Sequence, residues 1–353
     1  MFSSLRNWFD DHFSHPDAIV IVILIIVATT IIFFFGEMLA PVIAASIIAY
    51  MLEGFVQFLT KENIPRIIAV YVSFFVLIGL MMFLFLGLAP VVSNQIGNFL
   101  GDLPKLVVKA GVLLENLPDK LPFGQIYDTD GIVSGIVGEL TALGQTLLSF
   151  SISSIPTMIL TIIYLFLVPL LVFFFLKDKD LLISFVKDFF PKDRLLLGRV
   201  WRDVDKQIGN YMRGKFYEIV LVGSITYFLF WLMGLNYSAL LGVIVGLSVI
   251  IPFVGAAIVT VPVIIAAFLQ FGFGTDLAWI VGIYFIIQIL DGNVLVPILF
   301  SEAVNLHPVA IVVAVLIFGG IWGFWGVFFA IPLATVIKSL FIAWPSYPQK
   351  HVD

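Results

Sequence analysis

The chain has 353 residues and a formal net charge of −5; 61% of its residues are hydrophobic and only 12% are charged. Soluble globular domains carry about a quarter charged residues, so this composition excludes an ordinary soluble domain and predicts an all-α, polytopic helical membrane protein. The apolar runs are long and uniform, without the alternation that marks transmembrane β-strands. The absence of cysteine excludes disulfides and thiolate metal sites.

Residues 1–90 are predicted to form the first three transmembrane helices. Their apolar runs cover residues 18–35, 38–52 and 67–88, and Gly36 and Pro41 separate the first two runs. A spanning helix needs about 20 apolar residues, so the second helix is expected to be short. No small-residue cleavage site follows the first run, which predicts a retained helix and not a signal peptide.

Residues 91–153 are less apolar and carry two stripes at helical spacing. The first stripe consists of Leu103, Leu106, Val107, Ala110, Leu113, Leu114 and Leu117, and the second of Ile132, Ile136, Leu140, Leu143 and Leu147. A turn-rich segment separates the stripes. This pattern predicts a helical insertion with one apolar face, which either packs against the rest of the protein or binds a partner.

Residues 154–176 form the next predicted span, and a basic loop follows at residues 177–215. The loop holds ten lysines and arginines and six acids, whereas residues 91–153 hold three lysines. Positive charge marks the cytoplasmic side, so we expect the loop, both termini and the tail at residues 344–353 to be cytoplasmic, with the 91–153 insertion extracytoplasmic. Adjacent anionic membrane lipid accounts for the basic loop, and we expect no nucleic-acid partner.

The C-terminal core, residues 216–343, is almost continuously apolar. No lysine or arginine occurs from Phe216 to Ile337, although four acids and one histidine remain. Because both ends are predicted to be cytoplasmic, the core must cross the membrane an even number of times. Four segments fit this requirement, at residues 216–234, 239–271, 277–299 and 309–337. The second and fourth segments contain breaks, and each is either tilted, kinked or re-entrant. Together with the four earlier spans, the total is about seven or eight.

Three Gly/Pro-rich segments interrupt this core. In the first, Pro252, Gly255 and Pro262 are expected to open or bend a helix, because proline lacks a backbone N–H and glycine resists the helical conformation. Backbone groups freed at membrane depth must face protein or a wet cavity. Paired interruptions of this kind are typical of a transporter binding site.

The second segment combines helix-breaking and polar residues. It contains Gln288, Asp291, Gly292, Asn293 and Pro297, followed by Glu302, His307 and Pro308. Gly292 is expected to end the helix, so that the polar side chains gather there, with the breaks at 292, 297 and 308 lining a pathway. Carboxylates at membrane depth are costly and mark transport pathways. Asp291 is therefore either a ligand for a proton, a cation or substrate hydroxyls, or a helix cap at the interface. Glu302 and His307 are either a proton-relay pair or part of an aqueous loop.

The third segment contains small residues that let another helix approach closely. These are Gly319, Gly320, Gly323 and Gly326, and the segment ends at Pro332. Together with the stripes of residues 91–153, these small-residue faces predict a homo-oligomer.

Glu218 lies near Arg213 and Lys215, which predicts a salt bridge at the membrane interface.

No catalytic set is recognisable. The sequence has no Walker A, GxSxG or HExxH motif, and its four histidines are too scattered for a metal site. Asp276 and Asp291 are the only aspartates available for an intramembrane protease, and Asp276 lies in a loop-like FGFGTD sequence. We therefore expect no enzymatic activity, no metal and no cofactor.

The C-terminal motifs resemble the signature of the AI-2E family of bacterial transporters. The family pattern of Gln-x-x-acid, Pro, Leu-His-Pro, Gly-Gly…Gly…Gly and Pro-Leu falls on Gln288, Asp291, Asn293, Pro297, Leu306–Pro308, Gly319, Gly320, Gly323, Gly326, Pro332 and Leu333. Pro252, Gly255 and Pro262 match the other family motif, and the likeness covers nearly the whole chain. The family more commonly has glutamate at the position of Asp291. Aspartate keeps the negative charge but has a shorter side chain.

This resemblance implies an inner-membrane transporter of about seven or eight spans. Members export autoinducer-2, a small hydroxylated furanosyl signal, and others exchange Na⁺ or Li⁺ for protons. The first hypothesis is thus a secondary transporter that exports a small polar metabolite by alternating access. Gln288, Asp291 and Asn293 would contact the solute or coupling ion. The second is a Na⁺(Li⁺)/H⁺ antiporter that uses the same carboxylate, and the third is a non-transporting membrane scaffold.

Overall fold

The computed structural model of the chain describes residues 16–115, 155–188, 195–252, 254–300 and 306–343. Within these ranges the chain forms helices joined by turns and has no β-strand, so the all-α prediction is confirmed. Five described helices are long and apolar enough to cross a membrane: Met38–Lys61, Arg66–Lys105, Asp205–Leu232, Val254–Phe271 and Thr275–Phe300. Four shorter apolar helices accompany them: Ile163–Lys177, Ser238–Ser248, Pro308–Gly323 and Trp325–Ser339. The chain is a polytopic helical membrane protein.

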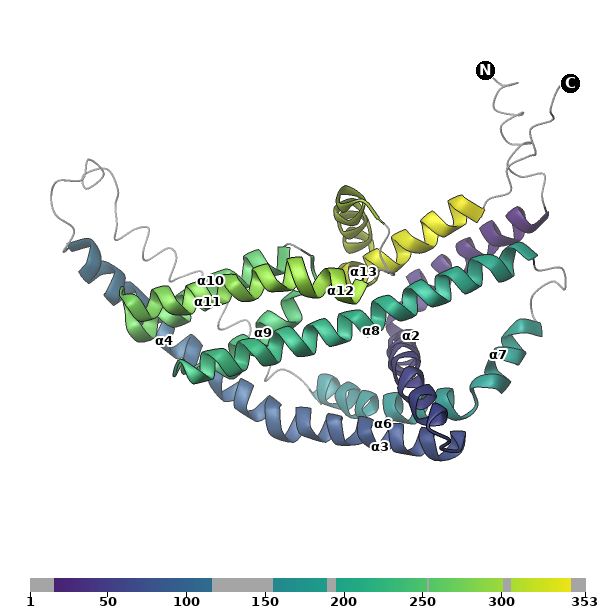
Figure 1. The fold of residues 1–353 in the computed structure, drawn as a ribbon, viewed down its shortest axis with the longest axis horizontal. Helices are drawn as coiled ribbons and strands as arrows, with labels where there is room; N and C mark the ends of the chain where they lie inside the picture. The colour runs from purple at the N-terminus through teal and green to yellow at the C-terminus, as the bar shows by residue number, and fades with distance from the viewer. Residues whose placement is uncertain (1–15, 116–154, 189–194, 253, 301–305, 344–353) are drawn as a thin grey trace, which may run out of the picture. The chain divides into compact units, whose positions relative to one another are not determined.

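The chain divides into two compact units. The first contains residues 1–78, 162–214 and 300–353, and the second contains residues 79–161 and 215–299. Helix α8 (Leu195–Leu232) contributes its N-terminal half to the first unit and its C-terminal half to the second. Each unit is described in turn (Figure 1).

The first unit begins with α2 (Pro16–Lys61), one continuous stretch of helix. Two separate helices were predicted here, divided at Gly36 and Pro41. The helical structure instead passes through both residues, and the ribbon of α2 changes direction along its length (Figure 1). A proline removes one backbone hydrogen bond and bends a helix without having to end it. The expected interruption is therefore a bend.

The third predicted span continues well beyond its expected end. Helix α3 (Arg66–Met82) runs into a π-helical turn, η1 (Phe83–Leu88), and then into α4 (Ala89–Glu115). Pro90, which cannot donate a backbone hydrogen bond, lies in the first turn of α4, two residues after the π-helical segment. Helical structure is continuous from Arg66 to Glu115, so the predicted insertion begins as a direct extension of the third span.

The first unit also contains α6 (Ile155–Lys177) from Ile162 on, α7 (Lys179–Asp188), the N-terminal half of α8, and α13 (Pro308–Ala343). Helix α13 reverses at Gly323, whose φ of 58° and ψ of −133° are not helical. A Cβ atom on Gly326 would lie 1.8 Å from the Phe318 carbonyl oxygen, and one on Gly319 would lie 2.8 Å from Val327. These glycines allow the two limbs of α13 to touch each other, while Gly320 has nothing within 4 Å of such a Cβ. Pro332 is buried within the second limb.

The second unit is built around a helical hairpin of α9 (Ser238–Ser248) and α10 (Val254–Phe271). The Gln270 side chain, at the end of α10, accepts a hydrogen bond from Asn236 N (2.8 Å) and donates one to Gly234 O (2.7 Å). Because Gly234 and Asn236 precede α9, the two outer ends of the hairpin lie together. Residues 239–271 were predicted as a single broken crossing, and the structure shows that they turn back. The segment is therefore a helical hairpin and not one kinked helix.

The hairpin packs on the other helices of its unit through small residues and a buried apolar core. Helix α11 (Thr275–Leu290), η2 (Asp291–Leu295) and α12 (Val296–Phe300) follow it. Glycines at 223, 242 and 246 bring the backbones of α8 and α9 into contact; a Cβ on Gly246 would lie 2.8 Å from Ile219 O. The core includes Leu241, Val245, Val263, Ile280 and Tyr284, all fully buried. Helix α4 lies alongside α9 and α10 (Figure 1).

Candidate functional site

The tip of the α9–α10 hairpin is an irregular backbone segment of the second unit. Helix α9 ends at Ser248 and α10 begins at Val254, with Pro252 between them. Gly255 makes the turn possible, because a Cβ atom there would lie 1.8 Å from the Ser248 carbonyl oxygen. The helical interruption expected around Pro252 and Gly255 therefore lies at a hairpin tip, where carbonyl groups at the end of α9 lack intrahelical partners.

Lys215 of α8 reaches one of these carbonyl groups. Its Nζ donates a 2.7 Å hydrogen bond to the Val249 carbonyl oxygen, and the residue is only 5% exposed. The carbonyl end of a helix carries a partial negative charge, so a cation there is favourable. Lys215 thus caps the C-terminus of α9 from a neighbouring helix.

Glu218 lies one turn further along α8 and pairs with the same ammonium group. Its Oε2 forms an ion pair with Lys215 Nζ at 2.6 Å. The predicted salt bridge to Lys215 is present, but Glu218 is 2% exposed. The pair is therefore buried within the protein, and its position relative to the membrane interface stays a prediction.

Asp291 lies close enough to interact electrostatically with both Lys215 and Glu218. It begins the π-helical turn η2 and is 8% exposed. Its buried Oδ1 has no hydrogen-bond partner in the part of the chain that the structure describes, and the same is true of the buried Nε2 of Gln288. Positions three apart share one face of a helix, so an unsatisfied acceptor and an unsatisfied donor occur on the same face.

The other predicted members of this segment lie elsewhere. Helical structure continues through Gly292 as the π-helical turn, so the expected helix end is absent. A π-helical turn absorbs an irregularity without ending the helix. Asn293 is exposed, and its Nδ2 donates a 2.8 Å hydrogen bond to the Ile289 carbonyl oxygen. It therefore does not contribute to the buried site around Asp291. Pro262 and Pro297 also lie inside α10 and α12 and break neither.

The His307 side chain lies at the start of α13, which begins at Pro308. Val309 N donates to His307 Nδ1 at 3.2 Å, and the residue is exposed. This contact caps the first turn of a helix. Glu302, its predicted relay partner, lies outside the described residues.

The outer ends of the hairpin are bound to α4. The Tyr237 hydroxyl donates to the Asp102 carboxylate, and Leu240 N donates to Gln95 Oε1 at 2.8 Å. Burial and the Asp102 carboxylate raise the pKa of Tyr237 to about 12, so this hydroxyl keeps its proton and remains the donor. Leu103, which belongs to the first predicted stripe, is buried, so this part of the stripe packs against the protein itself.

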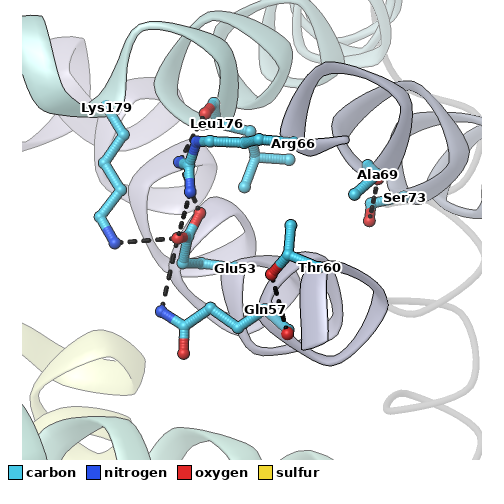
Figure 2. Close-up of polar contacts among 8 residues, drawn as sticks. All are labelled: Glu53, Gln57, Thr60, Arg66, Ala69, Ser73, Leu176 and Lys179. Atoms are coloured by element: carbon cyan, nitrogen blue, oxygen red, sulfur yellow. Dashed lines mark hydrogen bonds and ion pairs between the residues drawn. The ribbon is translucent and has the colours of Figure 1, made fainter. Parts of the chain in front are cut away.

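A second buried carboxylate joins three helices in the first unit. Figure 2 shows Arg66 and Lys179 pointing at Glu53 of α2, with distances of 3.1 and 2.9 Å to its Oε1. Arg66 also donates to the Leu176 carbonyl oxygen at 3.2 Å. Because each oxygen of Glu53 has a cationic partner, we interpret this cluster as a structural connection between α2, α3 and α7, to which Arg66 adds the end of α6.

Sequence reasoning identified Asp291 and Gln288 but did not include Lys215 in the site. The signal that could have found it was its position as the last cation before 122 residues without lysine or arginine. Lys215 lies three positions before Glu218 and four before the apolar run that begins at Ile219. The long side chain of a lysine at such a boundary can extend along α8 towards the apolar segment. Its acceptor at Val249 depends on the hairpin, which the sequence did not specify.

Comparison with known proteins places these features in a family. The family model described as "AI-2E family transporter" matches residues 19–346. Putative permease PerM of Escherichia coli (strain K12) is 41% identical over 348 residues, covering 98% of each chain. Putative transport protein YueF of Bacillus subtilis (strain 168) is 26% identical over 308 residues, covering 86% of this chain and 83% of YueF. AI-2 transport protein TqsA of Escherichia coli (strain K12) is 22% identical over 313 residues, covering 86% and 85%. The chain therefore belongs to the AI-2E family of membrane transport proteins.

Proposed function

We propose that this protein is a secondary transporter of the bacterial inner membrane that exports a small polar metabolite, such as autoinducer-2, by alternating access. The observation that carries the proposal is the pair of buried, unsatisfied polar atoms, Asp291 Oδ1 and Gln288 Nε2. Unsatisfied buried groups are costly, and a solute with hydroxyl groups can donate to the carboxylate and accept from the amide. The similarity to TqsA, named as an AI-2 transport protein, supports this solute class.

The hairpin fits the geometry that transport requires. Broken helices near the middle of the membrane form the solute sites of many transporters. In the orientation predicted from the lysine and arginine distribution, the base of the α9–α10 hairpin is extracytoplasmic and its tip extends towards the cytoplasm. A solute that binds beside the tip would then enter from the cytoplasm, the direction that export needs.

Export of autoinducer-2 from loaded proteoliposomes tests the proposal. Asp291→Asn removes the charge with little change in shape, and we expect export to fall about tenfold or more, because a hydrogen bond to a charged group contributes about 1.5–3 kcal/mol. Asp276→Asn is the matched control, since Asp276 is an exposed acid in the first turn of α11. Undiminished export by correctly inserted Asp291→Asn would remove Asp291 from the mechanism.

A second candidate function is Na⁺(Li⁺)/H⁺ exchange through the same site. The observation that favours it is the proximity of two buried carboxylates, Glu218 and Asp291, to the Lys215 ammonium group. The test is the collapse of a preset ΔpH in proteoliposomes when Na⁺ or Li⁺ is added. Collapse by the wild type and not by Asp291→Asn would support exchange, and a flat wild-type trace would argue against it.

A further inference from the structure

We propose that Thr226 of α8 is a specificity-determining residue, whose hydroxyl group binds a hydroxyl group of the exported solute. The inference rests on the proposed function and adds a third polar group to those of Asp291 and Gln288. It is carried by the unsatisfied state of the hydroxyl group, its place on the buried face of α8 and the chemistry of its surroundings.

The hydroxyl group of Thr226 has no hydrogen-bond partner among the residues that the structure describes, although the residue is fully buried. A threonine inside a helix commonly satisfies its hydroxyl group by donating to the carbonyl oxygen four residues earlier. Thr260 and Thr335 do so here, each at 2.8 Å, to the carbonyl oxygens of Ala256 and Ile331. Thr226 lies within α8 and does not make this bond, so its hydroxyl group is left for a partner outside its own helix.

An unsatisfied hydroxyl group in a buried place lowers the stability of the folded protein. Valine, which has nearly the same shape as threonine, would fill the same space without this cost. A local rule of folding that is broken in this way is typical of a functional site. We therefore interpret the Thr226 hydroxyl group as a binding group.

Thr226 lies on the same buried stripe of α8 as Glu218. The stripe recurs at helical spacing and consists of residues 215, 218, 222, 226 and 230. Val222 and Phe230, which lie one turn to either side of Thr226, belong to the apolar core that also contains Tyr284 of α11. The Thr226 side chain therefore faces the core of the second unit.

The contacts of α8 with α9 show how far Thr226 lies from the hairpin tip. A Cβ atom on Gly246, near the tip, would lie 2.8 Å from the Ile219 carbonyl oxygen. A Cβ atom on Gly242, one turn nearer the base, would lie 2.7 Å from the Tyr227 Cβ. Thr226, the neighbour of Tyr227, is thus at the level of Gly242 and nearer the base of the hairpin.

This level follows the Asp291–Gln288 pair in the direction of export. Asp291 interacts electrostatically with Glu218, which places the pair near the Glu218 end of the stripe. Thr226 is eight residues further along α8, about 12 Å at 1.5 Å per residue. In the predicted orientation the base of the hairpin is extracytoplasmic, so a solute that leaves Asp291 for the outside reaches the level of Thr226 next.

The surroundings of Thr226 fit an uncharged, hydroxylated solute. A hydroxyl group both donates and accepts, so it can pair with a solute hydroxyl group in either direction. Val222 and Phe230 add apolar surface on both sides, and one hydroxyl group between them cannot replace the hydration shell of a cation. A site that forms a hydrogen bond to a solute hydroxyl group discriminates against an analogue without it.

Thr226→Val in the purified full-length protein tests the inference through stability, binding and export. Without solute, we expect Tm to rise by about 2–4 °C, because the unsatisfied hydroxyl group is gone. Added autoinducer-2 stabilises a protein that binds it, and this gain in Tm should be smaller than in the wild type. Export from proteoliposomes should fall about fivefold, as expected for the loss of one hydrogen bond.

Thr335→Val is the matched control, because Thr335 is equally buried and its hydroxyl group has an acceptor. It should not raise Tm and should leave export unchanged. Thr226→Ser and Thr226→Ala keep the test decisive if Thr226→Val does not fold. The serine variant retains the hydroxyl group and should bind and export within about twofold of the wild type, whereas the alanine variant should lose both.

A lower Tm in Thr226→Val would overturn the inference, because the hydroxyl group would then have a structural partner. Wild-type binding and export by Thr226→Val, whatever its Tm, would refute the inference alone, as would equal losses in the serine and alanine variants. Binding of autoinducer-2 that depends on Thr226, without export by the wild type, would refute the proposed function alone. A wild type that neither binds nor exports autoinducer-2 would refute both.

Discussion

Substitution of Gly255 by alanine tests the closed hairpin most directly. In the structure, the added Cβ would lie 1.8 Å from the carbonyl oxygen of Ser248 and 2.6 Å from its carbonyl carbon. Real Cβ atoms do not approach a heavy atom closer than 3.0 Å, so the oxygen must retreat by about 1.2 Å. Both contacts are to backbone atoms, and no side-chain rotation can relieve them.

The magnitude follows from two opposing effects. Overpacking costs about 1–3 kcal/mol, and the backbone clash places this substitution at the upper end. Alanine recovers about 0.5–1 kcal/mol through its better helix propensity. The net expectation is a loss of about 2 kcal/mol in the free energy of unfolding, which corresponds to a fall of roughly 4 °C in Tm.

The measurement is thermal unfolding in detergent, followed by the fluorescence of the seven tryptophans. The matched control is Gly282→Ala in α11, where nothing lies within 4 Å of the added Cβ. This control should leave Tm unchanged or raise it, because only the helix propensity acts. If both variants have the same Tm as the wild type, the limbs of α9 and α10 are not in contact at Gly255 and the hairpin is refuted.

Two further substitutions test the first unit. Gly326→Ala should lower Tm as Gly255→Ala does, because the added Cβ would lie 1.8 Å from a carbonyl oxygen of the opposite limb of α13. Gly320→Ala is the control, since nothing lies within 4 Å of the Cβ added there. An equal loss of Tm in both variants would contradict a tight turn at Gly323. Glu53→Gln should lower the free energy of unfolding by about 1–2 kcal/mol, below the 3–5 kcal/mol of a fully buried pair, because its cationic partners are 37% and 31% exposed. Thermal unfolding measures this loss, with exposed Asp180→Asn as its control, and an unchanged Tm would show that the cluster is not a structural connection.

The sequence was sufficient to predict the helical membrane class and the interruption at Pro252 and Gly255. Both depend on local properties: the length of the apolar runs, the missing proline N–H and the missing glycine side chain. The same reasoning placed breaks at Gly292 and Pro262, where the structure keeps helical backbone. Neighbouring helices can supply enough packing to override a local preference, and a single sequence does not contain that information directly.

The reversal of the α9–α10 segment could not be predicted for a different reason. A kinked crossing and a hairpin have the same apolar runs and the same break, and they differ in whether the ends meet. That outcome depends on contacts between residues far apart in sequence, such as those of Gln270 with Gly234 and Asn236. The burial of Lys215 follows from the hairpin, since its acceptor at Val249 exists only when the tip turns there.

The shortness of α9 has a consequence for how the protein is made. Its 11 residues cover about 16 Å, roughly half of the 30 Å hydrocarbon core, so α9 cannot be inserted as an independent spanning segment during synthesis. Its burial depends on α4, which emerges earlier, and on α10, which emerges later. The native packing of α9 is therefore complete only after α10 has been synthesised. The face of α8 at Gly223 is likewise covered by α9 only once the hairpin exists.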